Sequence, residues 1–268
     1  MPLNPVVAKA MPHFWEEPCI SGKNGSGAVF FSGCTLGCVF CQNAKISHEG
    51  YGKELTSSEL RKVFDRLIDK GVHNINLVTP SHFSDKIIEA IGDGLPVPVI
   101  FNSSGYELVD TIRKFENKVQ IYLPDFKYSN SKISKKYSLA EDYPEIAKSA
   151  IIEMYRQVGS CRFDDNGMLL SGVVIRHLIL PQNTKNTFGV IDWVAKTFPK
   201  GDVIFSLMSQ YTPPKDMIKY PELSRRISKR EYEKCCNYML DAGIENGFVQ
   251  ELSSAKEEYT PDFDLSGI

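Results

Sequence analysis

The chain has 268 residues, seven cysteines and a formal net charge of −2 at pH 7. This near-neutral balance, without a basic block, does not point to binding of nucleic acid or of an anionic membrane. No apolar segment approaches the roughly 20 residues of a membrane helix and no signal peptide is recognised, so we expect a cytoplasmic protein with reduced cysteines.

Residues 1–27 are predicted to form an N-terminal leader loop. Within them, residues 13–22 mix aromatic residues, acids and a proline without any period, which favours an ordered loop and not a helix. The glycine cluster at residues 22–27 lacks the order of a phosphate-binding loop and precedes a strand, so it indicates a turn.

Three cysteines in a C-x-x-x-C-x-x-C pattern follow the first predicted strand, and they are Cys34, Cys38 and Cys41. A cubane iron-sulfur cluster normally takes four cysteines, one for each iron, so a three-cysteine site leaves one iron open. Gly33 and Gly37 can take positive φ, which is expected to let the loop curl closely around a cluster and direct N–H groups at its sulfurs.

This motif, with Phe40 directly before the third cysteine, resembles that of the radical S-adenosylmethionine (SAM) superfamily. The resemblance implies that the three cysteines hold a [4Fe-4S] cluster, that its open iron binds SAM, and that Phe40 packs near the adenine. In that family, reduction of the cluster cleaves SAM to methionine and a 5′-deoxyadenosyl radical, which abstracts hydrogen from a substrate. The implied partner is a low-potential electron donor such as a flavodoxin or a ferredoxin.

A closed zinc or iron-sulfur site, with Cys19 as the fourth ligand, is the alternative interpretation. Zinc sites are usually built from pairs of C-x-x-C, and this chain has no second pair. Cys161 is isolated, whereas Cys235 and Cys236 are adjacent within a predicted helix. We interpret these last three cysteines as ordinary thiols.

Downstream of the motif, apolar strands alternate with helical patterns, which predicts β-α units and a parallel sheet. The expected strands are residues 28–32, 74–79, 97–102, 119–124, 173–180 and 203–208, with a short last strand at 248–250. The expected helices are residues 57–70, 84–91, 107–115, 144–158, 187–198 and 228–241. Six such units resemble the partial (β/α)6 barrel of radical SAM enzymes, so the predicted fold class is α/β with one barrel domain over residues 28–250.

Local signals mark several boundaries. Thr56 with Glu59 forms a capping box before one helix, and a second helix begins at Ser228, capped with Glu231. Asn-Gly between two short apolar runs predicts a hairpin over residues 161–170. The acidic, aperiodic tail, residues 251–268, is expected to lie on the surface or to be mobile, and we assign it no chemistry.

Function in such barrels sits at the carboxyl ends of the strands. Along the fourth strand, alternate residues from Val119 to Lys127 share one face, so Asp125 and Lys127 are expected to crown the barrel. This Asp-Phe-Lys segment resembles the Asp-Leu-Lys motif beside SAM in the pyruvate formate-lyase activating enzymes, which are glycyl-radical activases. Asp125 and Lys127 are therefore the candidate catalytic and SAM-binding residues, and a surface ion pair is the alternative.

Arg176 interrupts the apolar fifth strand, and a guanidinium there needs a fixed anion. Asp125 or the SAM carboxylate is the expected partner, and the resemblance places a matching arginine at the SAM site. His177 points to the opposite face, which favours a hydrogen-bonded core histidine.

The third strand ends in small polar residues, Asn102, Ser103 and Ser104, which suit ribose hydroxyls and the surroundings of a sulfonium. Asn102 stands where the activating enzymes carry an acid that helps to hold a monovalent cation, so the resemblance does not extend to a cation site. A plain loop cap is the alternative for all three residues.

Two further positions depart from the activating enzymes. Thr79-Pro80-Ser81-His82 replaces the Gly-Gly-Glu motif that meets the SAM amino group, which leaves Thr79 and Ser81 as candidate contacts. Gln210 stands where the activase has a SAM-contacting histidine. The leader and the Thr-Pro-Ser-His variant resemble a little-characterised branch of these enzymes.

Two functional hypotheses result from these patterns. The first is a radical SAM oxidoreductase that acts on a glycyl-radical partner protein, in the manner of an activase, or on a small molecule. The second is a non-catalytic module that holds zinc or a closed cluster and scaffolds a partner.

Overall fold

The computed structural model describes residues 2–250 and 261–268. Its strands are β1 (Val6–His13), β2 (Ser26–Phe31), β3 (Lys53–Glu54), β4 (Ile75–Val78), β5 (Val99–Ser103), β6 (Ile121–Pro124), β7 (Arg162–Phe163), β8 (Leu169–Leu178), β9 (Ile204–Met208) and β10 (Gly247–Val249). Its helices are α1 (Pro18–Ser21), α2 (Ala44–Ser47), α3 (Ser57–Asp69), α4 (Ser84–Ile91), α5 (Val109–Lys114), α6 (Ser131–Ser138), α7 (Tyr143–Val158), α8 (Thr184–Thr197) and α9 (Lys229–Asp241), with short 3-10 turns η1 (Ser81–Phe83) and η2 (Pro221–Leu223).

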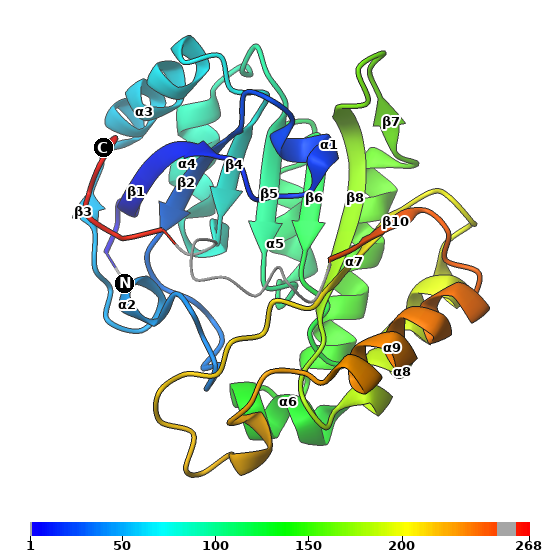
Figure 1. The fold of residues 1–268 in the computed structure, drawn as a ribbon. Helices are drawn as coiled ribbons and strands as arrows, with labels where there is room; N and C mark the ends of the chain where they lie inside the picture. The colour runs from blue at the N-terminus through cyan, green and yellow to red at the C-terminus, as the bar shows by residue number, and fades with distance from the viewer. Residues whose placement is uncertain (1, 251–260) are drawn as a thin grey trace.

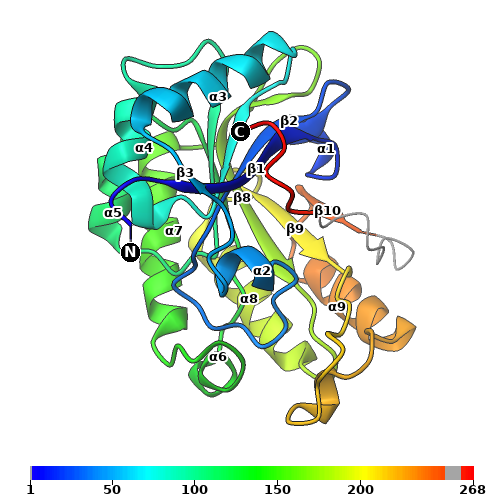
Figure 2. The ribbon, with the colours of Figure 1, turned by 90° about the vertical axis from the view of Figure 1, so that its left-hand side faces the viewer.

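The strands form one curved, open sheet in the order β10-β9-β8-β6-β5-β4-β2-β1-β3, with β7 paired to β8 (Figure 1). From β2 to β10 along this path, every neighbouring pair is parallel. Because parallel neighbours require crossover connections, helices lie between successive strands and α4, α5 and α7 stack along the outer face (Figure 2). The predicted α/β fold, a partial barrel with a parallel sheet that does not close, is confirmed.

Apolar residues bury both faces of this sheet. On the outer face, alternate strand residues such as Phe101 and Tyr122 pack with the helices in one large core cluster. On the inner face, Ile100, Ile121 and Leu123 form a smaller cluster with Ile20 and Cys19 of α1. The one-turn helix α1 therefore fills the barrel interior near the beginning of the strands (Figure 1), which leaves the carboxyl ends of the strands for a site.

The leader differs from the loop that the sequence predicts. Residues Val6–His13 form β1, which pairs antiparallel with β2, and Pro18–Ser21 form α1, with Pro18 at its first turn. Four successive residues of β1 are buried, and one of them is Lys9, which makes the strand hard to recognise in sequence; Lys9 donates to Asp262 O and Asp264 Oδ1. A charged residue in a buried strand becomes acceptable only when such partners are present.

Several local predictions are confirmed. The capping box of Thr56 and Glu59 starts α3, and that of Ser228 and Glu231 starts α9. The hairpin is the antiparallel pair β7 and β8, although its second strand continues as the long barrel strand β8. The short last strand is β10, which adds in parallel to β9. The helix α6, which begins at the side-chain cap Asn130, was not predicted.

Part of the predicted tail, residues 251–260, lies outside the described residues. Residues 261–268 run along β1, where Ala10 N donates to Ser266 O at 3.0 Å and Leu265 N donates to Ala8 O at 3.2 Å. Phe263 is buried against Phe30 and Ile46. This segment, which we call the C-terminal strap, lies on the surface of the sheet edge (Figure 1).

Within the described ranges, none of the helices combines the length and the apolar character that crossing a bilayer requires.

Candidate functional site

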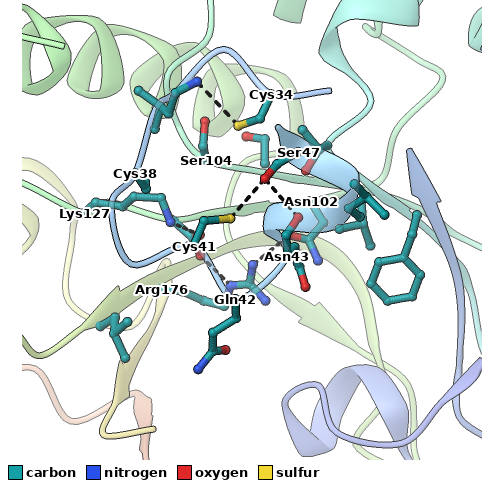
Figure 3. A pocket seen from close by; sticks show the side chains of 18 of the residues that line it. Cys34, Cys38, Cys41, Gln42, Asn43, Ser47, Asn102, Ser104, Lys127 and Arg176 are labelled. Carbon is teal, nitrogen blue, oxygen red and sulfur yellow. Dashed lines mark hydrogen bonds and ion pairs between the residues drawn. The ribbon is translucent and has the colours of Figure 1, made fainter. Parts of the chain in front are cut away.

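A cavity of about 260 Å³ opens at the carboxyl ends of the parallel strands, beneath the loop between β2 and α2. Residues predicted from separate parts of the sequence line it together: Cys34, Cys38, Phe40, Cys41, Thr79, Asn102, Ser103, Ser104, Asp125, Lys127, Arg176 and Gln210. Figure 3 shows the cysteines, Lys127 and Arg176 around it. Of the predicted contacts, Ser81 alone is absent from this lining.

The cysteine loop leaves β2 through a sharp turn at Gly33, whose φ is 95°. A Cβ there would also come within 3.0 Å of His82 Nε2, which itself lies 2.6 Å from Ser32 O. The prediction of positive φ at Gly37 is wrong. Gly37 is instead a point of close packing, because its N–H donates to Ser138 O and a Cβ would lie 3.2 Å from Leu139.

Each of the three sulfurs has a hydrogen-bonding neighbour. The N–H of Leu36 donates to Cys34 Sγ at 3.5 Å, and the Ser138 hydroxyl donates to Cys38 Sγ at 2.9 Å. Ser47 Oγ lies 3.2 Å from Cys41 Sγ (Figure 3). Such contacts are the means by which proteins orient sulfur ligands and tune iron-sulfur centres.

The donor set fits a multi-iron cluster better than a single ion. Within residues 2–250 and 261–268, no three His, Cys, Asp or Glu side chains converge closely enough to hold one metal ion. The cysteines of a cubane each bind a different iron and therefore need not converge on one point. Burial raises the pKa of Cys34 to about 11 and also raises that of Cys38, so these thiols keep their protons until a metal centre stabilises the thiolates.

Cys19 does not join the other three cysteines. It lies in the barrel interior with Ile100, Ile121 and Cys161 around it, and it is absent from the cavity lining. The alternative in which Cys19 completes a four-cysteine site therefore disagrees with the structure, because α1 holds this thiol against the beginning of the strands.

Arg176 is the centre of the polar network on the cavity floor. Its Nε donates to Asp125 Oδ1 at 2.9 Å, its Nη1 to Glu16 Oε2 at 3.0 Å and its Nη2 to Asn102 Oδ1 at 2.7 Å. Asp125 also accepts from Lys127 Nζ at 2.6 Å. Of the two anions predicted to pair with Arg176, Asp125 does so. Each of the three guanidinium nitrogens donates to a protein acceptor.

The charges of this network stabilise one another. Burial alone would raise the pKa of Asp125, but the Arg176 guanidinium and the Lys127 ammonium outweigh it and lower that pKa. Burial alone would lower the pKa of Lys127, yet the Asp125 carboxylate raises it. Both groups therefore stay charged at neutral pH, which keeps a fixed ammonium beside the cysteine loop.

The loops after β4 and β5 contribute small polar groups. Thr79 has φ of 61°, which is unusual for a β-branched residue, and its N–H donates to Asn102 O at 2.8 Å. Ser81 begins the turn η1 and lies beside Glu107, away from the cavity. Burial raises the pKa of Glu107 to about 7, while the neighbouring hydroxyls of Ser81 and Ser103 oppose this shift.

Aromatic and amide side chains also line the cavity. The ring of Phe40 is buried and meets Tyr211 edge-on, with ring centroids 5.9 Å apart. Gln210 lines the cavity, and its Oε1 accepts from Gln250 Nε2 at 3.3 Å.

His177 lies on the other side of β8 and is buried, with Nδ1 2.7 Å from Phe126 O and Nε2 3.0 Å from Thr187 Oγ1. Its prediction as a core histidine is therefore confirmed.

Residues from the two ends of the chain also reach the cavity, and no local sequence pattern predicts them. Glu16 accepts hydrogen bonds from three side chains: Arg176, Asn76 through Nδ2 at 3.0 Å, and Asn102 through Nδ2 at 3.3 Å. Trp15 and Pro261 also line the cavity. The one available signal was the aromatic, acidic character of residues 13–22, which required burial somewhere.

The chain is similar in sequence to known proteins. The sequence model of the Radical SAM superfamily matches residues 28–188, more than half of the chain. An uncharacterized protein of Methanocaldococcus jannaschii, MJ0674, is 28% identical in an alignment 222 residues long that covers 78% of this chain and 60% of that protein. The chain thus spans less than two thirds of this relative.

Solved structures share the fold at low sequence identity. SuiB of Streptococcus suis, crystallised with its precursor peptide SuiA and also with S-adenosylmethionine, aligns with a TM-score of 0.56 at 13% identity. The alignment with the peptide complex covers 83% of this chain and 48% of SuiB. HydG, a maturase of the [FeFe]-hydrogenase, aligns with a TM-score of 0.54 at 14% identity over 81% of this chain and 48% of HydG.

Proposed function

The chain belongs to the radical SAM superfamily, and we propose that it is an oxidoreductase that abstracts hydrogen from its substrate at the cavity beneath the cysteine loop. Its cofactors are a [4Fe-4S] cluster and SAM. When bound, they supply a reductive cleavage that releases methionine and a 5′-deoxyadenosyl radical. Holding these cofactors and positioning the charged groups around them is the role of the protein's own side chains.

In this proposal, Cys34, Cys38 and Cys41 hold the cluster and leave one iron for SAM. The observation that carries it is that three cysteines of one loop line the same cavity as a half-buried network in which Arg176 and Lys127 both pair with Asp125. A structural metal site needs no such charged floor, whereas a site for a charged ligand does.

The hydrogen bonds of the polar residues support a specific role for each. Lys127 presents a permanent ammonium whose direction is set by Asp125, and Arg176 holds Asp125, Glu16 and Asn102 in register. We assign Arg176 to positioning and not to direct contact with the SAM carboxylate, because three of its five N–H groups already donate to protein acceptors. Our proposed SAM contacts remain Phe40, Thr79, Asn102, Ser103, Ser104, Asp125, Lys127 and Gln210, whereas Ser81, which is absent from the cavity lining, is withdrawn from that set.

The experiment is anaerobic purification followed by metal analysis and electron paramagnetic resonance. We expect about four irons per chain, a spectrum of the reduced cluster that changes when SAM is added, and formation of 5′-deoxyadenosine under reducing conditions. Stoichiometric zinc, or a reduced cluster whose spectrum ignores SAM, would contradict the proposal. A low-potential flavodoxin or ferredoxin is the proposed electron donor.

We further propose that the substrate is a glycine residue of a partner protein. The support is the Asp125-Phe126-Lys127 segment, which resembles that of the glycyl-radical activases and whose two charged residues both line the cavity. The test is incubation of reduced protein and SAM with candidate glycyl-radical partners. A glycyl signal in the paramagnetic resonance spectrum supports activation, and its absence with every candidate assigns the radical to a small molecule.

A further inference from the structure

A second cavity, of about 190 Å³, adjoins the first one. Five residues line both cavities, and they are Trp15, Glu16, Arg176, Met208 and Gln210. The remaining lining comes from the leader and from β9 and β10 with the residue after it, and consists of Phe14, Glu17, Pro18, Ser206, Phe248 and Gln250. None of these six residues was used in the proposed function. We call this space the leader cavity.

Two buried side-chain oxygen atoms at the leader cavity, one in Glu17 and one in Gln250, have no hydrogen-bond partner among the described residues. Glu17 is only 8% exposed, and its Oε2 has no hydrogen-bond partner among the described residues. The same is true of Gln250 Oε1, although Gln250 Nε2 is engaged by Gln210. Buried polar atoms are nearly always paired, and an unpaired one costs stability. Two such acceptors in one cavity indicate a ligand that carries hydrogen-bond donors.

The charge balance of the leader cavity favours a cation. Arg176 lines it, but this guanidinium is neutralised by Asp125 and Glu16. Among the described residues, Glu17 forms no ion pair of its own. Burial raises its pKa, and the attraction of the Arg176 charge and a hydrogen bond with Ser206 only partly oppose that shift. A bound cation would supply the missing counter-charge, because a buried carboxylate is stable only when it is paired.

Aromatic faces complete the surroundings. Phe14 and Trp15 are about half exposed, at 53% and 49%, and both line the cavity together with Phe248. Aromatic rings attract cations through their faces, most strongly when the cation is partly desolvated. Acceptors, a carboxylate and aromatic rings in one small space match an ammonium or guanidinium group and do not match an anion or a plain hydrocarbon.

We propose that the leader cavity binds the ammonium or guanidinium group of a ligand, and that this group anchors the substrate next to the cavity of the cysteine loop. The first part stands on the leader cavity alone, whereas the second part rests on the proposed function. A free alkylamine and the side chain of a lysine or arginine in a peptide offer the same chemistry, and the size of the cavity admits either.

The binding test is calorimetry on the cluster-loaded protein with n-butylammonium, methylguanidinium, tetramethylammonium and n-butanol. We expect saturable binding of the first two, and at least about tenfold weaker binding of tetramethylammonium, which carries no N–H donor. No binding of n-butanol is expected. Equal binding of tetramethylammonium, or no saturable binding of either N–H cation, would overturn the proposal.

Variants locate the binding. Glu17→Gln keeps the shape of the side chain and is expected to weaken binding of n-butylammonium at least about tenfold, since it removes the charge. Phe14→Ala, at a half-exposed position that does not endanger folding, should weaken it about threefold. The control Glu145→Gln removes an exposed carboxylate of α7 and should leave binding unchanged. Unaltered affinity in both Glu17→Gln and Phe14→Ala contradicts the assignment.

Two further measurements separate this inference from the proposed function. Cys38→Ala protein without a cluster should bind n-butylammonium as before, which tests the leader cavity even if radical chemistry fails. In the cluster-loaded protein, end-blocked Gly-Lys-Gly and Gly-Arg-Gly peptides are compared with the free cations for stimulation of 5′-deoxyadenosine formation. Stimulation by the peptides identifies a peptide source, and stimulation by the free cations alone identifies a small amine. Binding without any stimulation refutes the substrate role.

Discussion

Arg176 on β8 and Asp125 just beyond β6 are joined twice. Arg176 Nε donates to Asp125 Oδ1 at 2.9 Å, and the backbones of the same two residues form an isolated parallel bridge. The side-chain pair thus prolongs the contact between two strands past the point where their regular ladder ends, at the floor of the cavity.

This double link predicts a large stability effect. Arg176→Gln leaves the half-buried carboxylates of Asp125 and Glu16 without their shared cation, and because Asp125 keeps Lys127 we expect a loss of up to about 3 kcal/mol in the free energy of unfolding. Arg176→Lys keeps the charge but not the three-way fork, so its loss should be smaller. Urea denaturation measures both. As a control, Lys200→Gln removes an exposed pair with Glu245 and should change stability by less than about 1 kcal/mol. A loss of less than about 1 kcal/mol for Arg176→Gln would contradict the role of the network.

The cysteines offer a direct comparison of positions. Cys34→Ala, Cys38→Ala and Cys41→Ala should each strongly reduce the iron and sulfide content of anaerobically purified protein, because each removes one of only three thiolates. Cys19→Ala and Cys161→Ala should keep about four irons per chain, since these thiols lie together in the barrel interior. Loss of the cluster in Cys19→Ala would show that the site needs a thiol from the leader.

The hydroxyl of Ser138 should raise the reduction potential of the cluster. It donates to Cys38 Sγ at 2.9 Å, and a hydrogen bond to a ligating sulfur stabilises the more negative, reduced state. For a bond worth about 1 kcal/mol, Ser138→Ala should lower the one-electron potential by about 40 mV. A redox titration followed by paramagnetic resonance measures the shift. Ser134→Ala, which removes another buried hydroxyl of α6, should leave the potential unchanged.

The buried carboxyl of Glu107 should make stability depend on pH. Its folded-state pKa is about 7 against an ordinary value of 4.5, so between these values the folded protein binds more protons than the unfolded chain. Stability attributable to Glu107 therefore falls as pH rises through this window, by up to about 3 kcal/mol. Glu107→Gln should lack this fall and become more stable than the wild type at pH 8, as measured by urea denaturation. Parallel pH profiles of the two proteins would contradict the prediction.

Much of the site could be predicted because it depends on local periodicity. The period of two along β6 and beyond it correctly puts Ile121 and Leu123 inside the barrel and Asp125 and Lys127 at the cavity. Val119 departs from this pattern, because β6 begins only at Ile121 and Val119 belongs to the outer core. The three cysteines could be recognised because their spacing confines them to one loop.

The partners of these residues could not be predicted because they come from remote parts of the chain. Glu16 reaches Arg176 across 160 positions, and no local pattern encodes that pairing. The strand β1 escaped prediction for a similar reason, since the ammonium of Lys9 donates to the carbonyl of Asp262 and the carboxylate of Asp264, both in the C-terminal strap. Ser81 was misplaced because the turn η1, set by packing of Phe83 in the core, directs it toward Glu107.

The C-terminal strap also bears on how the protein comes to be assembled in a cell. A ribosome makes Trp15 and the cysteine loop early, but Pro261, which lines the same cavity, is made only after nearly all of the barrel. The machinery that delivers iron and sulfide would thus meet an uncovered loop while translation is under way. Once the strap settles on β1, Pro261 becomes part of the cavity wall, so we expect loading during synthesis to be easier than loading of the finished chain.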